Sequence, residues 1–151
     1  MSGSNKAAKG VTVTSGVYTG SCICGSVKYE ICGEFRALLH CHCGRCRKSS
    51  GTGHASNVIL VPETVTWTAG EELLGGYRVP DAEHFRTVFC RNCGSPLPRV
   101  RPDRSIAVIP AGTLDVSPEL KPTGRIFYAS RTDWSCGDVA LPVWNEYRTQ
   151  S

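Results

Sequence analysis

The cysteines of this chain follow a pattern that is typical of metal binding. The sequence has nine cysteines in 151 residues, and seven of them lie in three short-spaced groups. These are Cys22 and Cys24, then Cys41, Cys43 and Cys46, then Cys90 and Cys93. Thiolate sulfur is a preferred ligand of Zn²⁺, and short spacings let neighbouring thiols converge on one ion. Because seven ligands divide into a set of four and a set of three, the sequence predicts two zinc ions per chain.

The first and third groups predict a structural zinc site. Cys24 and Cys93 are each followed directly by a glycine, which permits the backbone angles of a tight metal-binding turn. Two such turns facing each other form a zinc ribbon, in which four thiolates complete the tetrahedral coordination. The alternative is a set of unrelated buried thiols, but isolated core cysteines do not fall at such short, repeated spacings. The predicted structural ligands are therefore Cys22, Cys24, Cys90 and Cys93.

The middle group predicts a second zinc site with a different role. Three thiolates leave one coordination position for water or substrate, which is the arrangement of a catalytic zinc. The alternative is a closed structural site completed by one of the four histidines, which are His40, His42, His54 and His84. Alternate side chains of an extended chain point to opposite sides, so His40 and His42 should face away from the thiols. We therefore favour an open catalytic site on Cys41, Cys43 and Cys46, with His42 as a hydrogen-bonding neighbour.

The composition favours metal over disulfides. The first ten residues, MSGSNKAAKG, contain no apolar run that could be the core of a signal peptide. A protein that is not exported keeps its thiols reduced, and an odd number of cysteines argues against complete internal pairing. We therefore expect a cytoplasmic protein. Cys32 and Cys136 have no cysteine nearby in sequence, and each is expected to be a buried small side chain or a free thiol.

The charge and the apolar runs also exclude some partners. The formal charge of +4 counts cysteine as neutral, but zinc ligands are deprotonated, so seven thiolates and two zinc ions lower it to +1. This balance gives little support for nucleic-acid binding. The longest apolar run, at 58–61, is far too short to span a bilayer. We expect neither a membrane nor a nucleic acid as partner, and the oligomeric state stays open.

Short alternating segments must hold the cysteine groups in place. Residues 26–31 alternate as a half-buried strand, residues 37–40 form a short strand, and residues 45–50 could form about one helical turn before Gly51. Further strands are predicted at 56–61, where Pro62 should end the strand, and at 64–68, around 77, at 84–89, at 105–109 and at 125–129.

The proline-rich stretch 96–102 should be an extended edge or loop, and residues 117–120 could begin a helical turn. Trp134 could line a pocket, but packing is the preferred interpretation of a lone tryptophan. The prediction is a mainly β fold: one zinc-binding domain over residues 16–151, preceded by a flexible tail of residues 1–15.

The three cysteine motifs also resemble a known family. The segments are GSCICG at 20–25 with VKY at 27–29, CHCGRCR at 41–47, and FCRNCGSPL at 89–97. In this order they resemble the glutathione-dependent formaldehyde-activating enzyme family (GFA domain), which also includes centromere protein V. The resemblance covers about residues 16–147.

The resemblance implies a fold, a metal content and a reaction. The fold is a β-tent of small antiparallel sheets around a zinc ribbon. The four-cysteine set holds the structural zinc, and the three-cysteine set holds the catalytic one. The family's reaction joins formaldehyde to glutathione to give S-hydroxymethylglutathione, and it is classed with the carbon–sulfur lyases. A small thiol such as glutathione and an aldehyde are the implied partners.

Two mechanisms are consistent with an open zinc site. The ion could take the substrate thiol as thiolate, or it could polarise a carbonyl oxygen after displacing its water. Three thiolates outweigh the charge of a divalent ion and weaken it as a Lewis acid, so both routes remain open. Arg45, Arg47 and Lys48 could attract an anionic substrate, although basic residues beside a turn also form an ordinary solvated surface.

The alternative function is a non-catalytic zinc module that binds protein or nucleic acid, as the centromere relative suggests. Such a module is expected to carry a long basic arm or a basic stripe interleaved with aromatic residues, and the sequence has neither. We therefore favour the enzyme, and we expect its second zinc to be the more labile one because fewer ligands hold it.

Overall fold

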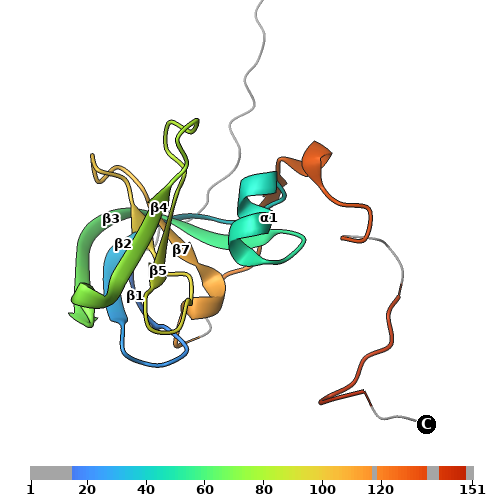
Figure 1. The fold of residues 1–151 in the computed structure, drawn as a ribbon, viewed down its shortest axis with the longest axis horizontal. Coiled ribbons are helices and arrows are strands. Elements are labelled where there is room, and N and C mark those ends of the chain that lie inside the picture. Colours follow the sequence, from blue (N-terminus) through green and yellow to red (C-terminus); the bar gives the residue numbers. More distant parts are fainter. Residues whose placement is uncertain (1–14, 117–118, 136–139, 149–151) are drawn as a thin grey trace, which may run out of the picture.

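The computed structural model describes residues 15–116, 119–135 and 140–148 of the chain. Its strands are β1 (Ser15–Ser21), β2 (Lys28–Cys41), β3 (Ala55–Ala69), β4 (Leu74–Arg78), β5 (Arg86–Cys90), β6 (Arg99–Val100), β7 (Ala107–Pro110) and β8 (Gly124–Ile126). The helices are α1 (Gly44–Ser50) and the 3₁₀ turns η1 (Glu71–Leu73), η2 (Ala111–Thr113) and η3 (Tyr128–Ser130). This part of the chain is mainly β, as the sequence predicts (Figure 1). None of its helices has the length and apolar character needed to cross a bilayer.

Six strands form the main sheet, in the order β1-β2-β3-β7-β6, and β8 also pairs with β2. β1 pairs antiparallel with the first half of β2, while β8 runs parallel to the end of β2, from Leu39 to Cys41. β4 and β5 form a separate antiparallel hairpin. α1 follows β2 and precedes β3, so it lies at one end of the two longest strands (Figure 1). The predicted small antiparallel sheets are therefore present, with one parallel pair added.

β3 is longer than the sequence predicts. A strand end at Pro62 is wrong, because β3 continues through Pro62 to Ala69. The pairing with β2 shifts register opposite this point, between Cys32 and Gly33. A bulge of this kind accommodates proline, which cannot donate a hydrogen bond to the ladder. Gly33 permits the close approach, because a Cβ there would clash with the Val61 carbonyl oxygen.

A second register shift, between Phe35 and Ala37, changes which side chains of β2 face the core. Up to Phe35 the odd-numbered residues are buried, whereas beyond the shift Leu38 is buried. Alternation then places Leu39 and Cys41 together on the face opposite Leu38. The irregularity in β2 therefore directs a predicted metal ligand away from the core.

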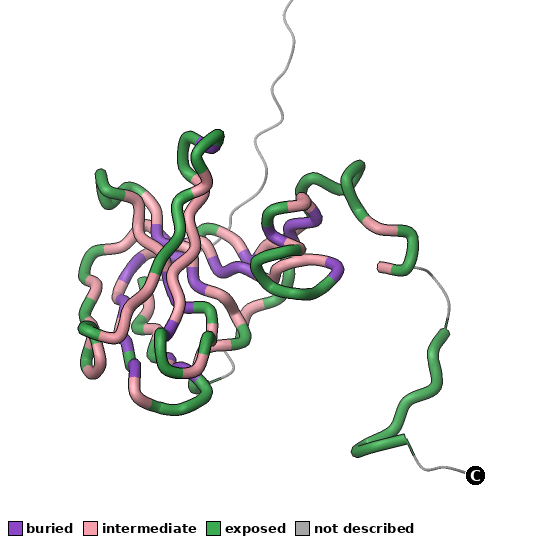
Figure 2. The backbone as a smooth tube through the Cα atoms, viewed as in Figure 1, coloured by how far each residue is buried: buried purple, intermediate pink, exposed green. Residues whose placement is uncertain are grey.

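The hydrophobic core lies against one face of the main sheet and continues toward the β4–β5 hairpin. Its buried members include Tyr29, Ile31 and Leu38 from β2, Val58 and Leu60 from β3, Ala107 and Ile109 from β7, and Leu97. Cys22 and Cys90 belong to the same cluster, so the first and third cysteine groups each contribute one buried side chain to the core. Figure 2 shows buried positions along the strands, whereas residues 140–148 are exposed throughout.

Several sequence predictions for the C-terminal third differ from the structure or fall on residues that it does not describe. The strand predicted at 125–129 is wrong in length, because Phe127 adopts a left-handed φ of 51° and a 3₁₀ turn follows. Trp134 is 73% exposed, so the prediction that it packs is also wrong. Residues 119–120 are not helical, and residues 117–118 of that predicted turn lie outside the described residues, as do Cys136 and residues 1–14 of the predicted tail.

Candidate metal centres

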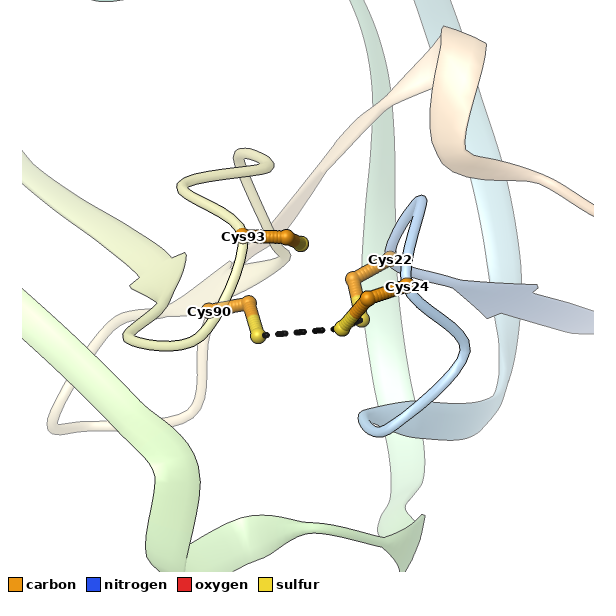
Figure 3. A group of neighbouring side chains, drawn as sticks. All are labelled: Cys22, Cys24, Cys90 and Cys93. Carbon is orange, nitrogen blue, oxygen red and sulfur yellow. Dashed lines mark hydrogen bonds between the residues drawn. The ribbon is translucent and has the colours of Figure 1, made fainter.

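Four cysteines from two distant turns form the first centre. The sulfur atoms of Cys22, Cys24, Cys90 and Cys93 all lie within 4.8 Å of one another. Figure 3 shows the two pairs facing each other across a small space. Cys24 Sγ lies 3.4 Å from Cys22 Sγ and 3.9 Å from Cys90 Sγ. Four sulfurs bound to one zinc at about 2.3 Å would be about 3.8 Å apart. The group can therefore enclose an ion with little rearrangement.

Two short turns, each closed by a backbone hydrogen bond from a glycine, present these cysteines. The Gly25 N–H donates to the Cys22 carbonyl oxygen at 2.9 Å, and the Gly94 N–H donates to the Cys90 carbonyl oxygen at 2.8 Å. Both glycines have a left-handed φ, of 74° and 77°. That conformation costs a residue with a Cβ roughly 1–2 kcal/mol. The glycines that the sequence places after the cysteines are therefore required by the backbone of the turns.

The surroundings of the four sulfurs favour the thiolate form of Cys24 and the thiol form of Cys90. Asn92 Nδ2 donates to Cys24 Sγ at 3.2 Å. Hydrogen bonds from the Ser26 and Asn92 side chains lower the pKa of the Cys24 thiol to about 5. Burial raises the pKa of Cys90 to about 11, so a bound cation would have to displace its proton. A converged sulfur set that combines a thiolate with buried thiols fits a zinc ion.

The second centre is built from one short stretch of chain, residues 41–46, at the junction of β2 and α1. The sulfurs of Cys41, Cys43 and Cys46 also lie within 4.8 Å of one another. Cys43 is the N-cap of α1, and its Sγ accepts a hydrogen bond from the Cys46 N–H at 3.3 Å. Burial raises the pKa values of Cys41 and Cys46. Burial acts to raise the pKa of Cys43 as well, but hydrogen bonds to its sulfur outweigh this effect, the Cys46 N–H being the strongest, and the pKa of Cys43 is lowered.

Backbone contacts fix this short segment. The His42 N–H donates to the Ile126 carbonyl oxygen of β8 at 3.0 Å. Arg47 Nε donates to the His42 carbonyl oxygen at 3.2 Å. Gly51 caps the C-terminus of α1; its φ is 69° and its N–H donates to the Arg47 carbonyl oxygen at 2.8 Å. Arg47, which the sequence proposes as an anion-attracting residue, is therefore also a structural support of the cluster.

No histidine of the described chain joins the three sulfurs. His40 stacks on His54 with ring centroids 4.1 Å apart. His42 is fully buried and meets the Tyr128 ring edge-on at 5.3 Å. His84 lies 3.4 Å from Glu83, between Nε2 and Oε1. The placement of His40 and His42 agrees with the alternation argument, and the cluster presents three sulfurs without a nitrogen ligand.

A cavity of about 600 Å³ opens onto the three-cysteine cluster. Its apolar walls include Leu39, Ile59 and Val108, and Arg45 and Lys48 also border it. Arg45 and Lys48 are exposed, so they are available to an incoming anion.

Sequence reasoning missed two polar residues of this cavity, Asn57 and Arg99. Asn57 is buried in β3, and Arg99 is half-buried in β6. Asn57 directly precedes the apolar run 58–61 within the strand predicted at 56–61, and a polar residue in such a strand is a signal that could have identified it. Arg99 follows two prolines in the segment assigned to an edge or loop, so nothing local distinguished it.

A wider groove of about 1200 Å³ adjoins the first cavity. Cys46, Asn57 and Arg99 border both spaces. The groove extends past Ile23 and Ser95 of the two four-cysteine turns. The three-cysteine cluster therefore lies where a small cavity meets a groove large enough for a peptide-sized molecule.

The model of the family "Glutathione-dependent formaldehyde-activating enzyme" (GFA) matches residues 17–130. The chain belongs to this family. The GFA match includes all seven clustered cysteines and both missed residues, whereas Trp134 lies beyond it.

The GFA chain is also similar to a solved structure, a Rhodobacter sphaeroides protein determined by structural genomics. The TM-score is 0.51 at 22% identity, and the similarity covers 71% of this chain and 98% of the other. This likeness supports the fold. No curated protein matches the sequence at a significant level.

Proposed function

We propose that the chain is a zinc-dependent enzyme of the carbon–sulfur lyase type that acts on a thiol–aldehyde adduct. The reaction would resemble the formation of S-hydroxymethylglutathione from glutathione and formaldehyde. The observation that carries the proposal is the three-sulfur cluster, which opens onto a cavity and has no histidine among its members. Family membership over residues 17–130 supports the choice of substrates.

The reaction itself is simple in its balance of atoms. A bond forms between the thiol sulfur and the aldehyde carbon, the carbonyl π bond breaks, and the proton lost by the thiol ends on the former carbonyl oxygen. No oxidant or reductant is required. The catalyst has to favour the thiolate, stabilise charge on the carbonyl oxygen and hold the two reactants together.

The three-cysteine cluster is the proposed site of the second zinc. Cys41, Cys43 and Cys46 would hold the ion, which would supply a Lewis acid and a coordination position for a small ligand. The four-cysteine cluster is the proposed structural site, because its sulfurs join two turns of the core.

The remaining residues of the cavity would bind and orient the reactants. Leu39, Ile59 and Val108 present an apolar wall that limits the access of water. Arg45 and Lys48, at the exposed border of the cavity, would attract an anionic thiol compound. The buried amide of Asn57 can donate or accept a hydrogen bond where the cavity meets the groove.

Exchange spectroscopy by NMR provides the test. Zinc-loaded protein is mixed with glutathione and ¹³C-formaldehyde, and the rate of interconversion with S-hydroxymethylglutathione is compared with the uncatalysed rate. We expect acceleration by the wild type, none by Cys46→Ser, and wild-type acceleration by Cys32→Ser, since Cys32 is a half-buried free thiol outside both clusters. A wild-type protein that holds two zinc ions and does not accelerate the exchange would contradict the proposal.

A further inference from the structure

Arg99 combines burial, position and charge in a way that the proposed zinc chemistry does not use. It is half-buried in β6, and its guanidinium carbon lies 5.3 Å from the centroid of the Phe85 ring. Such a cation–π contact holds a guanidinium in place without using its N–H donors. Within the described residues no carboxylate forms an ion pair with Arg99. A fixed cation with its donors available is suited to bind an anion from outside the protein.

The sheet register directs Arg99 toward the three-cysteine cavity. Ile59 of β3 pairs with Val108 of β7, and Val108 pairs with Arg99 of β6. Directly paired residues lie on the same face of a sheet. All three residues line the 600 Å³ cavity. Arg99 is therefore the polar end of a row of side chains that crosses three strands and forms the cavity wall.

The charge around Arg99 is consistent with this position. Burial lowers the pKa of Arg99 from its ordinary value, and the charges of Cys46, Cys41 and Cys43 partly offset the effect. Arg86, the nearby arginine, donates to the Val100 carbonyl oxygen and so is committed to the backbone. Arg99 thus stands beside the cluster as a half-buried cation available for a ligand, in addition to the exposed Arg45 and Lys48 at the border of the cavity.

Arg99 also borders the wider groove of about 1200 Å³. A ligand whose thiol reaches the cluster could place a neighbouring carboxylate on Arg99 and extend the rest of its length along the groove. A carboxylate matches the planar fork of the guanidinium and can accept two parallel hydrogen bonds.

We propose that Arg99 is the specificity-determining residue of this site: it binds a carboxylate of the thiol substrate at the junction of the cavity and the groove. The proposal rests on the proposed function, because it takes the three-cysteine cluster as the place where the thiol reacts. It restricts the substrate class to thiols that carry a carboxylate. Thiols without an anionic group should be poor substrates even when they fit the cavity.

The first test compares glutathione with its diethyl ester, which keeps the thiol and removes both carboxylates. Arg99→Met should raise KM for glutathione about 10- to 100-fold, the range expected for losing a hydrogen-bonded charged partner. The variant should change KM for the diester by about twofold at most, since no charge is lost there. Arg99→Lys should restore part of the preference for glutathione. Arg78→Met, at the exposed end of β4 and outside both spaces, is the matched control.

A purely structural role for Arg99 predicts a different result. If the residue only balances the charge of the thiolates, Arg99→Met should lose zinc and should impair glutathione and the diester equally. Zinc content and melting temperature of each variant are therefore measured alongside the kinetics. Equal impairment of both substrates would overturn the proposal.

A binding experiment separates this proposal from the proposed function. S-methylglutathione has no free thiol and cannot react, so its affinity can be measured by calorimetry whether or not the protein is an enzyme. We expect wild type to prefer S-methylglutathione over its diethyl ester and Arg99→Met to lose that preference. If the preference exists without turnover, the catalytic proposal fails and the Arg99 proposal stands. If wild type binds both compounds equally or neither, the Arg99 proposal fails.

Discussion

Replacing Cys93 with serine should destabilise the fold strongly, and the size of the effect can be worked from the loop that the four-cysteine cluster closes. Cys24 and Cys90 are 66 residues apart in sequence, with sulfurs 3.9 Å apart in the fold. A cross-link that closes a loop of this length restricts the unfolded chain by about 4 kcal/mol. A domain is stable by only about 5–15 kcal/mol in total. The expected loss in melting temperature is on the order of 10–20 °C.

Replacing Cys43 with serine should have a small effect on stability, for a reason specific to this position. Cys43 caps α1 by accepting the Cys46 N–H, and serine is a preferred N-cap residue that can accept the same hydrogen bond. Its cluster spans only the six positions from Cys41 to Cys46, which β2 and α1 already hold together. The change should therefore remove the second metal and the proposed activity while leaving the melting temperature within about 3 °C, a cost of roughly 1 kcal/mol or less.

The assay is thermal unfolding by circular dichroism, with zinc stoichiometry measured on the same samples. Cys32→Ser, a free thiol in β2 outside both clusters, controls for the substitution itself. Wild type should carry two zinc ions, and Cys43→Ser should carry one. The reasoning is refuted if Cys43→Ser melts as low as Cys93→Ser, because the second cluster would then be structural too. It is also refuted if Cys93→Ser keeps wild-type stability.

Three further predictions concern the metal, the backbone and pH. A chelator added at neutral pH should remove the zinc of the three-cysteine cluster first, so exchange activity should fall before the circular dichroism melt changes; simultaneous loss would contradict separate roles. Gly70→Ala should lower the free energy of unfolding in urea by at least about 2 kcal/mol, because the φ of Gly70 is 72° and the new Cβ would clash with the Ser26 carbonyl oxygen. Gly51→Ala is the matched control: the φ is 69° but the space around it is open, so the loss should be only about 1 kcal/mol. Burial raises the pKa of Tyr29 from 10.0 to about 12. The folded state therefore favours its neutral form, and this contribution to stability should be complete below pH 10 and lost between pH 10 and 12. The urea midpoint of wild type should fall through that window more than that of Tyr29→Phe, and parallel curves would count against this reasoning.

The cysteine grouping could be predicted because the spacing of metal ligands is a local property. Cys41, Cys43 and Cys46 lie on one turn, so three side chains converge whatever the rest of the chain does. The pairing of the first and third groups needed one further step, the recognition that each turn alone has too few ligands for zinc. That His40 and His42 point away from the sulfurs could also be predicted, because alternate side chains of an extended chain point to opposite sides.

The elements that went wrong depend on partners that sequence patterns do not display. The sequence predicts a strand end at Pro62, which has no N–H to donate. The register shift at Gly33 on the neighbouring strand interrupts the hydrogen-bond ladder at this point, so β3 continues without that donor. The sequence predicts a strand at 125–129, but pairing with β2 ends at Ile126, and Phe127 then adopts a left-handed φ. In both cases the neighbouring strand, and not the local sequence, decides where the strand ends.

Arg99 shows the same dependence at the functional site. In the sequence it stands 53 positions after Cys46 and follows two prolines, so no motif connects the two. The connection appears only when β7 pairs between β3 and β6, which places Arg99 in register with Val108 and Ile59. The register shift before Leu38 turns Cys41 toward the same cavity. The metal ligands are thus encoded locally, whereas the residue proposed to select the substrate is placed by the order and register of the sheet. It follows that relatives could keep the cysteine motifs and change their substrate by altering β6, which carries no metal ligand.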